Sequence, residues 1–118
     1  MIPKKILGKY GEKHACKFLL GNGYKIIENN YRCRYGEIDI IAFKDNIFYF
    51  IEVKTRQSKE FGEPEESIDL PKLKKICLAA QHYISCKNLL ECDYRFDAIS
   101  VIVCNNKPAF KHINNIIQ

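Results

Sequence analysis

The sequence has no long apolar run, and its first segment, MIPKKILGKYGEKHACKF, carries charges where a signal peptide needs an uninterrupted apolar stretch. It also lacks cysteine pairs, because the six cysteines are scattered, with no Cys-x-x-Cys and no cluster at zinc-ligand spacing. These absences argue against a membrane partner and a structural zinc. We therefore expect a cytoplasmic protein with free thiols.

Repeats and low-complexity tracts are absent as well. A chain of 118 residues, 47% of them hydrophobic and 28% charged, is typical of one globular domain, here residues 1–118. The 19 Lys and Arg residues exceed the 14 Asp and Glu residues, which gives a formal net charge of +5. This charge attracts polyanions, but it supports a nucleic-acid partner only if other features point to one.

Hydrophobic spacing and turn residues divide the chain into helices and strands. The pattern predicts helices over residues 4–22 and 70–87, and strands over 24–31, 35–43, 47–56, 94–104 and 109–113. The polar segment 57–69, with Gly62 and Pro64, predicts a loop. The order of elements indicates an α/β fold in which helices pack on a mixed sheet.

Charged residues stand in the strand over 47–56, although both of its faces are otherwise apolar. If Asp45-Asn46 forms a two-residue turn, paired residues across the hairpin place Asp39 opposite Glu52. The same register places Glu37 opposite Lys54, with all four side chains on one face. Two carboxylates then face each other on neighbouring strands.

Like charges at this spacing repel, so the facing carboxylates predict a cation between Asp39 and Glu52. Oxygen ligands favour Mg²⁺ or Mn²⁺, and Lys54 beside them could activate water for phosphodiester hydrolysis. The alternative is structural: Glu37 and Lys54 form an ordinary ion pair while Asp39 and Glu52 project into water. A register slip of one residue would remove the metal site.

Gly36-Glu37-Ile38-Asp39 and, after a spacer of twelve residues, Glu52-Val53-Lys54 resemble the PD-(D/E)XK nuclease signature, with Ile38 in place of its proline. The segments GEIDIIA, FIEVKTR, FGEP and RFD resemble the YraN-like family of small endonuclease-like proteins over nearly the whole chain. The second helix lacks the Gln-x-x-x-Tyr pattern of the exonuclease branch.

This resemblance implies a restriction-endonuclease-like mixed β-sheet flanked by helices. It implies Asp39 and Glu52 as ligands of Mg²⁺ or Mn²⁺, with the carbonyl of Val53 as a third ligand and Lys54 as the catalytic lysine. In related junction-resolving nucleases a helix carboxylate completes the site. Glu12 matches that position, and its alternative is a solvated surface residue.

Basic residues around the hairpin and on the second helix could contact a phosphate backbone, or simply form a solvated basic surface. The candidates are Arg32, Arg34, Arg56, Lys72 and Lys75. Asp97, a charge within an apolar strand, is expected to form a structural ion pair with Arg95 or with a basic residue at the end of the sheet.

We therefore expect a metal-dependent endonuclease acting on DNA, with branched or damaged DNA from repair or recombination as one candidate substrate. A homodimer would supply two sites for cutting both strands. The alternative is a non-catalytic nucleic-acid-binding or scaffold protein that retains the nuclease fold.

Overall fold

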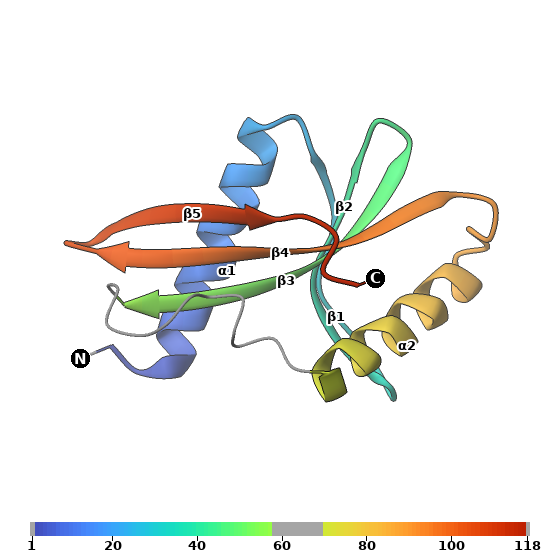
Figure 1. Ribbon diagram of the computed structural model, residues 1–118, viewed down its shortest axis with the longest axis horizontal. Helices are drawn as coiled ribbons and strands as arrows, with labels where there is room; N and C mark the ends of the chain where they lie inside the picture. Colours follow the sequence, from blue (N-terminus) through green and yellow to red (C-terminus); the bar gives the residue numbers. More distant parts are fainter. Residues whose placement is uncertain (1, 58–69, 118) are drawn as a thin grey trace.

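The computed structural model describes residues 2–57 and 70–117, so the FGEP motif lies outside the described residues. The elements in chain order are α1 (Lys4–Gly21), β1 (Lys25–Cys33), β2 (Gly36–Lys44), β3 (Ile47–Gln57), α2 (Leu70–Cys86), β4 (Asp93–Cys104) and β5 (Lys107–Ile113) (Figure 1). None of the described helices is long and apolar enough to cross a membrane. The six cysteines are free thiols, as predicted.

The strands form one sheet in the order β1-β2-β3-β4-β5. Strands β3 and β4 run parallel, whereas the other neighbouring pairs are antiparallel hairpins. A parallel pair needs a crossover connection, and α2 lies within the connection from β3 to β4. The predicted α/β class, a mixed sheet flanked by helices, is confirmed.

The two helices cover opposite faces of the sheet (Figure 1). Side chains alternate along β2, so that Ile40 packs with Leu19 of α1. Its neighbour Ile41 packs with Ile76 of α2. Each face of β2 is therefore buried, which explains the nearly continuous apolar sequence of this strand.

The turn between β2 and β3 sets the register of the hairpin. Asp45 and Asn46 have φ angles of 51° and 65°, the left-handed conformation that a type I′ turn requires and that Asp and Asn tolerate. Lys44 pairs with Ile47 across this turn, as the sequence predicted.

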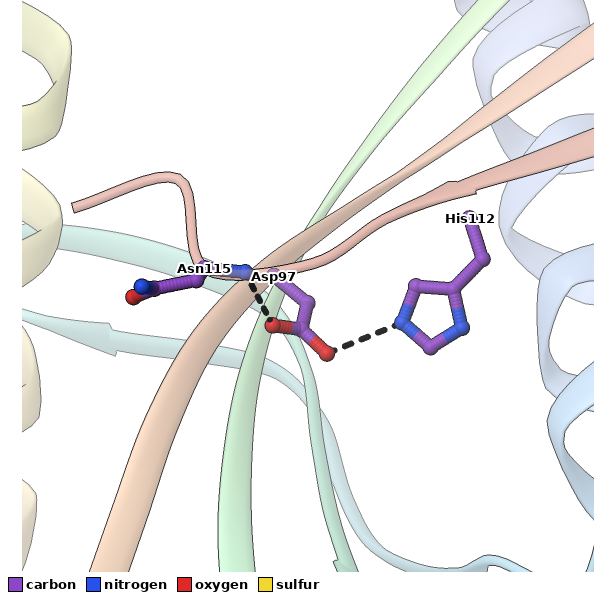
Figure 2. A network of polar contacts seen from close by, with 3 residues as sticks. All are labelled: Asp97, His112 and Asn115. Atoms are coloured by element: carbon purple, nitrogen blue, oxygen red, sulfur yellow. Dashed lines mark hydrogen bonds and ion pairs between the residues drawn. The ribbon is translucent and has the colours of Figure 1, made fainter.

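Asp97 is 1% exposed and lies in a hydrogen-bonded network on β4 (Figure 2). Its carboxylate accepts hydrogen bonds from His112 Nε2 at 2.9 Å and from the backbone N–H of Asn115 at 2.8 Å. The expected partners were Arg95 or a basic residue at the end of the sheet. Arg95 is exposed, and the partner in the structure is His112 on the edge strand β5. Asp97 thereby ties β5 and the residues after it to the core.

We expect Asp97→Ala to lower the free energy of unfolding by about 3 kcal/mol, because it leaves the His112 and Asn115 donors without their buried acceptor. Urea denaturation followed by circular dichroism measures the change. Asp93→Ala, an exposed residue of the same strand, is the control and should change stability by no more than about 0.5 kcal/mol. Equal effects would contradict this role of Asp97.

Candidate active site

The candidate site lies where β2 and β3 separate. Their backbone pairing follows the predicted register as far as Ile40 opposite Ile51. Beyond this pair the acceptor is a side chain instead of a backbone carbonyl. Asp39 Oδ2 accepts a hydrogen bond from Val53 N–H at 2.8 Å. The predicted facing pair, Asp39 and Glu52, thus lies one residue beyond the last backbone pair of the two strands.

The carboxyl groups of Asp39 and Glu52 interact directly. Glu52 is 4% exposed, which rules out the alternative in which it projects into water. The pKa of Asp39 is raised to about 8, mainly by burial and next by the nearby charge of Glu52. The hydrogen bond from Val53 opposes this shift. A half-buried carboxyl in contact with a buried one calls for a proton or a cation between them.

Two lysines lie beside the carboxyl pair. Lys72, in the first turn of α2, forms an ion pair with Glu52. Burial, and then the hydrogen bond and charge of Lys72, lower the pKa of Lys54. Lys54 is therefore held in a setting that disfavours its charged form. The sequence suggested Lys72 only as a phosphate contact and gave no sign of its pairing with Glu52.

An open pocket of about 540 Å³ adjoins these groups. The predicted site residues among those lining it are Glu12, Asp39, Glu52, Val53, Lys72 and Lys75. They come from α1, β2, β3 and α2. The fold therefore brings together residues that are far apart in the sequence.

Glu12 reaches the pocket because α1 lies against β3 at Gly11. A Cβ atom at Gly11 would lie 1.7 Å from Thr55 Oγ1, so no larger residue fits without movement. Burial raises the pKa of Glu12, a hydrogen bond with Asn30 lowers it, and the charges of Glu37 and Glu52 raise it. Glu12 thus lines the same pocket as Asp39 and Glu52, and its role as a member of the site stays a prediction.

Of the five predicted phosphate contacts, Lys72 and Lys75 line this pocket, whereas Arg32, Arg34 and Arg56 are not among its described lining residues. Arg32 pairs with Glu37 at 3.4 Å, so the alternative in which Glu37 serves as the partner of Lys54 is not what the structure shows. Arg34 stacks on the Tyr35 ring at 4.9 Å and donates a hydrogen bond to the Tyr35 hydroxyl at 2.7 Å. Arg56 lies on β3, two residues beyond Lys54.

The donor set suits a hard divalent cation. Asp39 and Glu52 offer carboxylate oxygens, one of which, Asp39 Oδ2, accepts a hydrogen bond from the Val53 N–H. Among residues 2–57 and 70–117, no three His, Cys, Asp or Glu side chains form a metal-binding group.

Residues 11–101 match the model of the family described as uncharacterised protein family UPF0102. A UPF0102 protein of Caldanaerobacter subterraneus subsp. tengcongensis is 43% identical over 117 residues, covering 99% of this chain and 96% of that protein. One from Alkaliphilus metalliredigens is 44% identical over 94% of this chain and 96% of its own length. The crystal structure of SSO0001 matches with a TM-score of 0.40 and 24% identity, over 98% of this chain and 54% of that chain.

The close packing at Gly11 predicts that Gly11→Ala destabilises the protein by roughly 1–3 kcal/mol, because the new methyl group meets Thr55. Gly8→Ala is the matched control on the same helix, since a Cβ there meets nothing within 4 Å. It should raise stability by about 0.5–1 kcal/mol through helix propensity. Thermal unfolding of both variants measures the difference, and two changes of the same sign would contradict this packing.

The raised pKa of Asp39 predicts a pH-dependent effect of Asp39→Asn on the metal-free protein. The unfolded chain loses this proton near the ordinary value of 3.8, whereas the fold retains it to about 8. Ionisation therefore destabilises the fold progressively as pH rises between these values. Asparagine keeps an oxygen that can accept the Val53 hydrogen bond but never ionises.

We expect Asp39→Asn to gain stability over the unmodified protein as pH rises from about 4 to 8, by on the order of 1 kcal/mol or more. Urea denaturation in the presence of a chelator measures this gain. Asp45→Asn, at the exposed turn, is the control and should show no such trend. A difference that stays constant with pH would contradict the buried carboxyl pair.

Proposed function

Because the chain belongs to the UPF0102 family, the YraN-like family that its motifs predicted, and because its motif carboxylates meet in one pocket, we propose that it is a Mg²⁺- or Mn²⁺-dependent endonuclease that hydrolyses phosphodiester bonds of DNA. The observation that carries this proposal is the contact of the Asp39 carboxyl with the buried Glu52 carboxyl beside two lysines.

Asp39, Glu52 and the carbonyl of Val53 would hold the metal. A bound Mg²⁺ or Mn²⁺ ion supplies positive charge that stabilises the phosphate in the transition state. Lys54, with its lowered pKa, orients the attacking water and exchanges a proton with it more readily than an ordinary lysine. Glu12, at the α1 side of the pocket, is placed to hold a second water.

Positive charge around the pocket supports a polyanionic substrate. Lys72 and Lys75 line the pocket, and the net charge of +5 favours a polyanion. Arg32 and Arg34, at the exposed β1–β2 hairpin, and Arg56 extend the basic surface along a backbone. Branched or damaged DNA is our proposed substrate, and a homodimer would place two sites for paired cuts.

Cleavage of labelled duplex, single-stranded and four-way DNA in Mn²⁺ tests this proposal. Asp39→Asn and Lys54→Met should each reduce the rate by roughly 100-fold or more, because each removes a group that acts on the reacting phosphate or water. Asp45→Asn, at the turn of the same hairpin, is the control and should cut at the unmodified rate.

Cleavage that persists unchanged in both site variants would contradict the proposed site. If the unmodified protein binds Mn²⁺ and DNA but cuts none of the three substrates, the alternative of a non-catalytic binding or scaffold protein is favoured. Calorimetric titration with Mn²⁺ and fluorescence anisotropy with labelled DNA separate these outcomes.

A further inference from the structure

Lys72 holds a position that the catalytic signature does not assign to any residue. It comes from α2, and its ammonium group forms an ion pair with Glu52 Oε2. Glu52 is 4% exposed, whereas the Lys72 side chain is 41% exposed. The buried partner is therefore fixed by the sheet, while the lysine has solvent on one side.

The ammonium group of Lys72 supplies positive charge beside the Glu52 carboxylate when no metal is bound. A divalent ion on the same Glu52 oxygens would repel this ammonium at short range. The two cations therefore compete for one carboxylate.

We propose that Lys72 is a positioning residue that holds Glu52 in the metal-free protein, competes with the divalent ion and is released toward the substrate phosphate when the ion binds. This inference rests on the proposed metal-dependent nuclease function. The flexible four-carbon stem of lysine permits such a movement, and Lys72 lines the 540 Å³ pocket into which the ammonium would move.

The neighbouring lysine of α2 provides a matched comparison. Lys74 lines a different pocket, together with Leu70, Leu73 and Cys77. It carries the same charge on the same helix, two residues from Lys72, but faces another part of the molecule. A general effect of removing one positive charge is therefore measured by Lys74→Gln.

Calorimetric titration with Mn²⁺, without DNA, tests the competition. Lys72→Gln should bind Mn²⁺ roughly three- to tenfold more tightly than the unmodified protein, because the ion no longer displaces an ammonium group. Lys74→Gln should stay within about twofold, the size of a screened long-range effect. Lys72→Arg, which retains the charge, should stay near the unmodified affinity.

A second measurement uses the unmodified protein and so does not depend on the folding of a variant. Brief labelling with an amine-reactive reagent, read by mass spectrometry, should modify Lys72 slowly without metal. Mn²⁺ should increase the labelling of Lys72 severalfold and leave Lys74 unchanged. This change reports release of the ammonium group from Glu52, which a purely structural ion pair would not show.

The outcomes distinguish this inference from the function on which it rests. Tighter Mn²⁺ binding by Lys72→Gln together with metal-induced labelling of Lys72 supports it. The inference is overturned if Lys72→Gln and Lys74→Gln change the Mn²⁺ affinity equally, or if Mn²⁺ does not change the labelling of Lys72. Either result leaves the proposed metal site intact. Failure of both the unmodified protein and Lys72→Gln to bind Mn²⁺ overturns the inference and the proposed metal site together.

Discussion

The candidate site is arranged around two carboxyl groups whose contact disfavours charge on both of them. Asp39 and Glu52 meet at the point where β2 and β3 part, and burial together with their mutual repulsion raises the pKa of Asp39 to about 8. A divalent ion that binds here would take the place of the proton on Asp39.

The remaining elements bring other groups to this point from both faces of the sheet. The close approach of α1 at Gly11 carries Glu12 to the pocket, and α2 carries Lys72 to Glu52. The Asp97 network secures β5 and the chain end elsewhere in the sheet, by contacts to His112 and Asn115.

The sequence predicted what local geometry controls and missed what tertiary packing controls. The Asp45-Asn46 turn and the two-residue period of strands were enough to bring Asp39 next to Glu52, because both rules act within one hairpin. The pairing of Lys72 with Glu52 depends on where α2 crosses the sheet, which no short-range pattern encodes. The choice of His112 as the partner of Asp97 likewise depends on how β5 pairs with β4.

A crystal of the protein soaked in Mn²⁺ and measured at the manganese absorption edge tests the central claim most directly. The account predicts an anomalous peak between the carboxylates of Asp39 and Glu52, near the backbone of Val53 and with the ammonium of Lys72 moved away. Carboxylates that remain in contact with no peak between them at saturating Mn²⁺, or that point to opposite faces of the sheet, would contradict it.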